Sequence, residues 1–209
     1  MDIKNIKMLI SDVDGVWTDG SFYKGTDNIE LKKFSVFDGV GVAMARAAKI
    51  RVALISGRFS SATKHRAKEL GIEDVYNGCL NKLPAYEELK SKYQLNDNNI
   101  AYIGDDLIDI PVMDVVALPI AVANATSEVK KISLHVTETA GGEGAFREAI
   151  SWIISEQIWG SIHEISGKFP GAICNPLQPC VALCLKGVEG LCLGDGSYLL
   201  FHQAFWTCL

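Results

Sequence analysis

The amino-acid sequence predicts an α/β fold of the Rossmann-like, three-layer α/β/α kind, built around a mostly parallel sheet. Short, uninterrupted apolar runs alternate along the chain with amphipathic stretches of helical period. Strands that are apolar along their whole length are buried on both faces, which is typical of parallel sheets covered by helices. The length agrees with this prediction, because 209 residues with 48% hydrophobic side chains suffice for one globular core.

The expected strands and helices follow one another in the order that this fold requires. Residues 6–10 form the first expected strand, and residues 22–34 are expected to form a β-hairpin around the polar turn 25–28. Further strands are expected at residues 52–55, 100–103, 117–122 and 134–136. Helices are expected at residues 39–49, 60–70, 83–93 and 143–157, the last with Phe146, Ile150, Ile153 and Ile154 facing inward.

The charge balance excludes several classes of partner. Lys and Arg number 20 against 25 Asp and Glu, which gives a net charge of −5 and leaves no basic stripe for nucleic-acid phosphates. No apolar run reaches the roughly 18 residues of a membrane span, and the first residues lack the apolar core of a signal peptide. We therefore expect a cytoplasmic protein without nucleic-acid or membrane partners.

The composition changes near residue 158. Residues 158–209 contain five of the six cysteines but only five charged side chains. The spacing of these cysteines matches no common zinc motif and no clean disulfide framework. We expect a catalytic domain at residues 1–157, followed at 158–209 by an apolar, Cys-rich C-terminal extension of unknown order. The extension could be a partner-binding segment or a stretch outside the ancestral domain.

Acidic residues follow two of the predicted strands. Asp12 and Asp14 come after the first strand, and Asp105, Asp106 and Asp109 come after the strand at 100–103. Because the carboxyl ends of parallel strands meet at one edge of a sheet, we expect these carboxylates to converge there. Converging carboxylates repel one another unless a cation neutralises them, and oxygen ligands suit Mg²⁺. We predict Asp12, Asp14 and Asp105 as metal ligands, with Asp106 and Asp109 supporting them.

Three further groups complete a site for a phosphate ester. The hydroxyl of Ser56, the backbone N–H groups around Gly57 and the ammonium of Lys82 can together cradle a dianion. Asp12 can then attack phosphorus, while Asp14 protonates the leaving oxygen and later deprotonates a water molecule. Mg²⁺ and Lys82 favour the ionised form of Asp12, which separates the roles of the two acids. The sequence thus predicts phosphoryl transfer through an aspartyl phosphate, with Asp12, Asp14 and Lys82 as catalytic residues.

Taken singly, each motif has a simpler interpretation. A D-x-D pair is often a solvated turn, Asp105–Asp106 can cap a helix, and a lysine is usually exposed. The four motifs together, each after its own strand or at a helix start, favour a site. A receiver domain is excluded, because its phosphate acceptor would follow the third strand rather than the first.

In this order the motifs resemble those of the haloacid dehalogenase-like phosphatase superfamily. The superfamily's D-x-D-G, S/T-G, lysine and G-D-D-x-x-D motifs match residues 12–15, 56–57, 82 and 104–109. Longer stretches closely resemble one family within it, the 3-deoxy-D-manno-octulosonate 8-phosphate (KDO 8-phosphate) phosphatases. These stretches are residues 12–20, 55–58, 81–83, 102–113 and 141–148, and the resemblance covers about residues 5–157.

The resemblance implies a Mg²⁺-dependent phosphatase that hydrolyses KDO 8-phosphate to KDO and phosphate in lipopolysaccharide precursor synthesis. It implies a member without a cap domain, because the residues between Gly20 and Val52 are too few to form a lid. It also implies a homotetramer, in which the hairpins associate and a neighbouring subunit covers the site. Arg58 would bind the carboxylate of the sugar acid, and Arg147 would face the anionic substrate.

Two alternative functions stay open at this stage. Trp17 stands where many relatives carry leucine. In this it resembles the tryptophan of a similar family, the phosphatases of 9-phosphorylated nonulosonic acids of the KDN or N-acylneuraminate type. Arg58 and residues 107–113 favour the KDO branch instead. The other alternative is a non-catalytic, phosphatase-like oligomerisation module. Such a module should have lost a motif residue, and none is missing here.

Overall fold

The computed structural model of the chain describes residues 3–27, 29–168, 189–192 and 198–201. The chain divides into two compact units, Met1–Ile158 and Trp159–Leu209. In the second unit, β9 (Glu189–Cys192) and β10 (Tyr198–Phe201) form an antiparallel pair. The cysteines at 174, 180, 184 and 208, on which part of the prediction for the extension rested, lie outside the described residues.

The first unit is built on a six-stranded parallel sheet, which confirms the predicted mostly parallel sheet and adds β5, a strand that was not among those expected. The spatial order of its strands is β5-β4-β1-β6-β7-β8, so β1 lies in the middle with β4 and β6 on either side. Every residue of β1 and β6 is buried, which explains their uninterrupted apolar sequences. The bounds of the six strands are β1 Met8–Ser11, β4 Arg51–Ser56, β5 Asp74–Asn77, β6 Ile100–Gly104, β7 Leu118–Ala121 and β8 His135–Val136.

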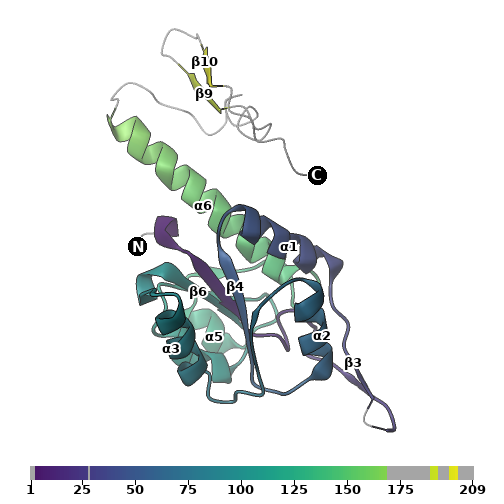
Figure 1. Ribbon diagram of the computed structural model, residues 1–209. Coiled ribbons are helices and arrows are strands. Elements are labelled where there is room, and N and C mark those ends of the chain that lie inside the picture. Colours follow the sequence, from purple (N-terminus) through teal and green to yellow (C-terminus); the bar gives the residue numbers. More distant parts are fainter. Residues whose placement is uncertain (1–2, 28, 169–188, 193–197, 202–209) are drawn as a thin grey trace. The chain divides into compact units, whose positions relative to one another are not determined.

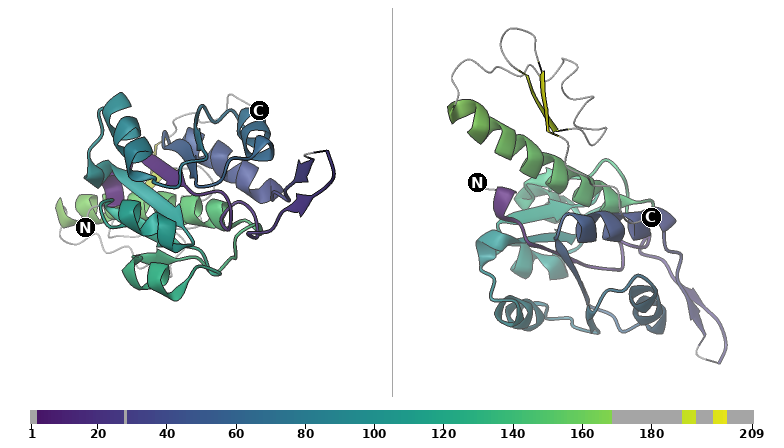
Figure 2. Two further views of the ribbon diagram at one scale, coloured as in Figure 1. Left: turned by 90° about the horizontal axis from the view of Figure 1, so that it is seen from below. Right: turned by 45° about the horizontal axis from the view of Figure 1, so that its top comes forward.

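Helices cover both faces of this sheet and give the predicted three layers (Figures 1 and 2). On one face α1 and α6 lie against each other, and the Arg147 backbone N–H donates to a carboxylate oxygen of Asp38 at 3.1 Å. The short helices α4 and α5 pack together with α3 on the other face. The bounds of the helices are α1 Val36–Ala47, α2 Ser61–Glu69, α3 Leu83–Lys92, α4 Ile110–Met113, α5 Ser127–Ile132 and α6 Ala145–Lys168.

The predicted hairpin is present between β1 and α1. Its strands, β2 (Tyr23–Lys24) and β3 (Glu30–Leu31), pair antiparallel and are shorter than expected. The hairpin projects from the body of the unit (Figure 1). Apart from this hairpin, the described part of the chain between β1 and α1 contains no helix or strand, and no cap domain is inserted there.

The closing helix is longer than the sequence indicates, so the expected end at residue 157 is wrong. Helix α6 continues to Lys168 because residues 158–168 contain no proline, and each of their two glycines, Gly160 and Gly167, costs only about 1 kcal/mol in a helix. The compositional boundary at residue 158 therefore lies inside a helix. Phe146, Ile150 and Ile153 face the core as expected. No helix among the described residues is both long and apolar enough to cross a bilayer.

Candidate active site

The central strands bring the predicted motifs to one edge of the sheet. Strands β4, β1 and β6 are neighbours and run in the same direction, so Ser56, Asp12 and Asp105 lie at or just beyond three adjacent carboxyl ends. The Asp12 backbone N–H donates to the carbonyl of Ile103 at 3.0 Å and continues the pairing of β1 with β6. The sheet itself therefore fixes the position of Asp12.

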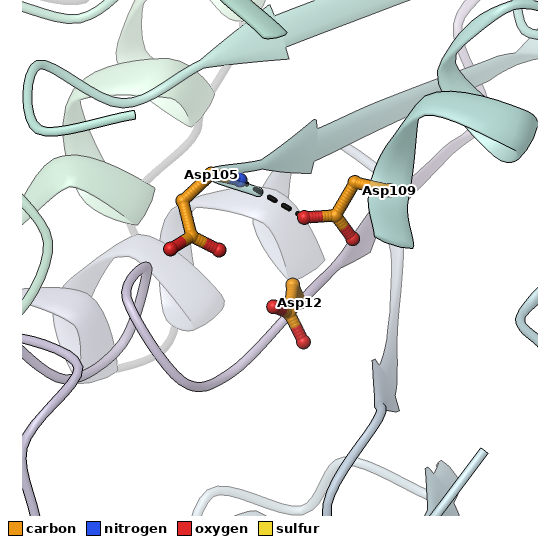
Figure 3. Close-up of side chains that lie close together, drawn as sticks. All are labelled: Asp12, Asp105 and Asp109. Atoms are coloured by element: carbon orange, nitrogen blue, oxygen red, sulfur yellow. Dashed lines mark hydrogen bonds between the residues drawn. The ribbon is translucent and has the colours of Figure 1, made fainter. Parts of the chain in front are cut away.

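Three carboxylates converge at this edge (Figure 3). Oxygen atoms of Asp12, Asp105 and Asp109 all lie within 4.8 Å of one another. Asp12 comes from the end of β1, whereas Asp105 and Asp109 come from the loop and short helix after β6. Asp105 Oδ1 is buried and has no hydrogen-bond partner, and the cation recorded beside Asp12 Oδ1 is Lys82, at 2.8 Å. Buried acceptors without a donor are unfavourable unless a cation satisfies them.

Asp109 differs from the other two because both of its oxygens are occupied. Oδ1 accepts from the Lys82 ammonium and from the Tyr102 hydroxyl, each at 2.6 Å. Oδ2 accepts from the backbone N–H groups of Asp105 at 3.0 Å and Asp106 at 3.2 Å. Asp109 thus anchors the loop after β6 and orients Lys82. It has no oxygen to spare for a metal, which suits the supporting role expected from the sequence.

Lys82 is the buried cation of the site. Its ammonium lies 2.6 Å from Asp109 Oδ1 and 2.8 Å from Asp12 Oδ1, and its side chain is fully buried. Tyr102 contributes a third contact, with its hydroxyl oxygen 3.2 Å from the ammonium. Burial lowers the pKa of Lys82, but Asp12 and Asp109 outweigh it and raise the pKa overall, so the ammonium stays charged.

The electrostatics of the cluster call for a further positive charge. Burial and the negative charge of Asp109 raise the pKa of Asp12 to about 6, although Lys82 acts in the opposite direction. Burial, with the charges of Asp12 and Asp109, raises the pKa of Asp105 to about 8. One ammonium is too little for three carboxylates. A hard divalent cation such as Mg²⁺ fits here, because Asp105 Oδ1 is buried without a partner and Asp12 shares the one ammonium with Asp109.

The Asp14 carboxylate lies outside this cluster. Its Oδ1 accepts a 2.5 Å hydrogen bond from the Lys32 ammonium, and its Oδ2 is buried without a partner. The sequence predicted both metal binding and proton transfer for Asp14. An oxygen without a partner, two residues along the chain from Asp12, suits the predicted proton transfer, whereas the side chain does not join the group of possible ligands.

A glycine is required where the loop after β1 meets the loop after β6. Gly15 has φ = +96°, and a Cβ there would lie 2.0 Å from Asp105 Oδ2. Any larger residue would collide with this carboxylate and would also strain the backbone. The glycine of the D-x-D-G motif therefore allows the two halves of the cluster to approach each other.

The residues after β4 have different partners. The buried Ser56 hydroxyl donates to the Arg58 carbonyl at 2.9 Å, and a Cβ on Gly57 would lie 2.8 Å from the Ile108 side chain. Both nitrogens of the Arg58 fork donate to the Glu30 carboxylate, and its guanidinium stacks over Phe22 at 4.0 Å. Arg58 is thus bound to the hairpin rather than free for a ligand.

The side chains of two other predicted residues lie outside the cluster. Arg147 is exposed, with its guanidinium carbon 5.6 Å from the centre of the Phe37 ring, and it lines a surface hollow of about 290 Å³. Among the described residues, its side chain makes no recorded contact with the three carboxylates. Asp106 is also exposed, and its carboxylate caps the turn after β6 by accepting from the Leu107 backbone N–H.

Trp17 is part of the core rather than of a substrate pocket. Its indole N–H donates to the Ser11 hydroxyl at 2.9 Å, and its ring packs on Phe146 with 4.5 Å between the centroids. The side chain is 1% exposed. A tryptophan here supports the strand that carries Asp12, so it cannot distinguish sugar acids by direct contact.

Three residues of the site escaped sequence analysis. Tyr102 lies within an apolar strand, where a tyrosine is expected simply as core. Lys32 and Glu30 belong to the hairpin, where charged residues on either side of Leu31 look like the exposed face of a strand. The two-residue period of a strand could have identified them. Glu30 and Lys32 lie on one face of the strand, whereas Lys33 lies on the other.

Comparisons with known proteins agree with this geometry. Residues 52–148 match the haloacid dehalogenase-like hydrolase family. The 3-deoxy-D-manno-octulosonate 8-phosphate phosphatase KdsC of Escherichia coli K12 is 43% identical over 165 residues, which cover 79% of this chain and 87% of the relative.

Two solved structures extend the comparison. The crystal structure of the phosphatase of the same name from Yersinia pestis has a TM-score of 0.73 and 44% identity, covering 75% of this chain and 84% of that one. The enzyme from Moraxella catarrhalis, crystallised with magnesium, phosphate and KDO, has a TM-score of 0.73 and 34% identity. That match covers 79% of this chain and 95% of the other.

Proposed function

The chain belongs to the 3-deoxy-D-manno-octulosonate 8-phosphate phosphatase family of haloacid dehalogenase-like hydrolases, and we propose that it hydrolyses KDO 8-phosphate through an aspartyl phosphate. The observation that carries this proposal is the buried Asp12 carboxylate, which lies beside Asp105 and has the Lys82 ammonium 2.8 Å from its Oδ1. Likeness to the E. coli relative supports the choice of substrate. We further propose that the product serves lipopolysaccharide precursor synthesis. The cytoplasmic location stays a prediction from sequence.

In the first step, an oxygen of Asp12 forms a bond to phosphorus while the bond from phosphorus to the sugar oxygen breaks. Asp14 Oδ2 gives its proton to the departing oxygen, so the sugar acid leaves with a neutral hydroxyl group at that position. Lys82, held by Asp109 and Tyr102, stabilises negative charge on the Asp12 carboxylate and on the phosphoryl group. Mg²⁺, when bound to Asp12 and Asp105, would supply further charge stabilisation.

In the second step, water attacks phosphorus and the bond from phosphorus to Asp12 breaks. Asp14 Oδ2 takes the proton that the water loses, which restores the acid for the next turnover. Inorganic phosphate leaves and the Asp12 carboxylate is regenerated. We propose that the Ser56 hydroxyl and the backbone N–H groups near Gly57 hold the phosphoryl oxygens during both steps.

The proposed substrate-binding roles of the two arginines differ in what they require. Arg58 can bind a substrate carboxylate only if it gives up at least part of its bidentate pair with Glu30. Arg147 would need its exposed guanidinium to turn from Phe37 toward the substrate. Both roles stay predictions.

We also propose that copies of the chain assemble as a homotetramer through the hairpin. Its large apolar side chains are exposed, most of all Tyr23 at 70% and Leu31 at 61%. Exposed apolar surface of this kind marks interaction sites. A subunit seated there could cover the site, since the described residues between β1 and α1 contain no cap domain.

The choice of substrate is tested by comparing two sugar acids. We expect kcat/KM with Mg²⁺ to be at least about 10-fold higher for KDO 8-phosphate than for KDN 9-phosphate, a typical worth of pocket contacts. Phosphate release would be measured on both substrates, with chelated metal as the control. A preference for KDN 9-phosphate would move the protein to the nonulosonic acid branch. Release from neither substrate would reject the enzymatic proposal.

A further inference from the structure

We propose that Lys32 is a positioning residue for Asp14, which fixes one oxygen of this carboxylate and leaves the other to carry the proton in catalysis. This inference rests on the proposed function, because it assigns Lys32 to the acid of the same reaction. Its basis is the Lys32–Asp14 pair, in which the lysine side chain is fully buried and the Asp14 side chain is 28% exposed.

Lys32 is anchored at two points in the interior. Its side chain is 0% exposed, and its ammonium lies 2.5 Å from Asp14 Oδ1 and 3.3 Å from Thr63 Oγ1 on α2. Lys32 directly follows β3, so the end of the hairpin places its ammonium beside the loop after β1. The next residue makes the contrast clear: Lys33 is 60% exposed and pairs with Glu143 at the surface.

The contact with Lys32 gives the two oxygens of the Asp14 carboxylate different surroundings. Oδ1 is occupied by the charge-assisted hydrogen bond from Lys32, whereas Oδ2 is buried and has no partner. A proton on this carboxylate is therefore expected on Oδ2. Among the described residues, Lys32 is the only hydrogen-bond donor recorded for the Asp14 side chain. Without it, the carboxylate is expected to rotate.

Stability alone does not explain why the lysine of this pair is buried. Removing an ammonium from water costs several kcal/mol, and apolar replacements of buried ion pairs are often neutral or stabilising. The surface pair of Lys33 and Glu143 carries no such cost. A lysine that is fully buried against a proposed proton donor fits a role in orienting that donor.

The test separates orientation of the acid from general damage by changing the leaving group. KDO 8-phosphate releases an alkoxide that needs a proton, whereas p-nitrophenyl phosphate releases a stable phenolate that does not. We expect Lys32→Met to lower kcat on KDO 8-phosphate by about 10- to 100-fold and on p-nitrophenyl phosphate by less than about threefold. Lys32→Arg should recover most of the loss. In an Asp14→Asn background, Lys32→Met should cause no further loss.

Lys33→Met is the matched control, and it should leave both substrates unaffected. Mg²⁺ affinity measured by titration calorimetry should be unchanged in every Lys32 variant, because Lys32 contacts neither Asp12 nor Asp105. If Lys32→Met does not fold, as judged by its melting curve, Lys32→Gln takes its place. Equal losses on the two substrates, or no loss on either, would overturn the proposal.

A structural measurement keeps this inference separate from the proposed substrate. In crystals of the metal-free Lys32→Met variant, the Asp14 side chain should leave the position that it has in the wild type, whereas Lys32→Arg should keep it. An unmoved Asp14 in Lys32→Met would overturn the positioning role. If wild-type protein does not act on KDO 8-phosphate, the proposed function fails while this crystallographic comparison still decides the role of Lys32.

Discussion

Replacing Asp12 with asparagine is expected to lower phosphate release by on the order of 10⁴-fold or more, because an amide oxygen cannot form the phosphoenzyme. The variant should fold normally. Asparagine has the same shape as aspartate. It also removes a buried carboxyl group, whose pKa is raised to about 6 by burial and by the charge of Asp109. Initial rates with saturating KDO 8-phosphate and Mg²⁺ would measure the loss, and melting curves would measure folding.

Asp19 offers a matched control for this experiment. It lies on the same loop, it is exposed, and its carboxylate accepts only a local hydrogen bond from the Ser21 backbone N–H. Asp19→Asn should keep activity within about threefold of wild type, as is usual for surface changes outside a site. Comparable rates in Asp12→Asn and Asp19→Asn would remove Asp12 from the chemistry.

Replacing Asp105 with asparagine is expected to weaken Mg²⁺ binding by at least about 100-fold, because one of the two carboxylates proposed as metal ligands is lost. Titration calorimetry would measure the change. Asp106→Asn is the matched control. Its side chain is exposed, lies outside the cluster, and as asparagine can still cap the following turn. We expect its Mg²⁺ affinity within about threefold of wild type, since it loses no ligand.

Asp105→Asn should also change how the stability of the metal-free protein depends on pH. In the folded state burial and neighbouring charges raise the pKa of Asp105 from 3.8 to about 8, so the folded protein binds more protons than the unfolded chain between these values. Stability is therefore lost as pH rises from about 4 to 8, and Asp12 adds to the slope up to about pH 6. Melting temperatures of metal-free protein between pH 5 and 8.5 should fall less steeply in Asp105→Asn. Identical slopes in the variant and the wild type would show that the carboxylate cluster does not cause the pH dependence of stability.

Much of the fold follows from the sequence, because its strands are buried on both faces. Residues 100–103 and 52–55 are apolar throughout, which sets them apart from the amphipathic helices between them. Once the strands are placed, the parallel sheet dictates that Asp12, Ser56 and Asp105 meet at one edge. The end of the last helix could not be placed in the same way, since no proline or strong stop signal marks residue 157.

The finer organisation of the site depends on contacts that no local pattern encodes. Whether an acid is free or occupied is decided by partners far along the chain, as Lys82 and Tyr102 occupy Asp109. Likewise, Arg58 has the guanidinium fork suited to a sugar carboxylate, yet in the folded chain Glu30 holds it. Residue type and spacing identify candidate groups. Their division into ligand, acid and support emerges only from the packed structure.

The most direct measurement of the central claim is the identity of the phosphorylated residue during turnover. Protein mixed with KDO 8-phosphate and Mg²⁺ would be quenched in acid within milliseconds, digested, and mapped by mass spectrometry. We predict phosphate on Asp12, and more of it in Asp14→Asn when an aryl ester is used, because the base for the second step is then absent. Phosphate on another side chain, or an unmodified Asp12 while product forms in a burst, would contradict the account.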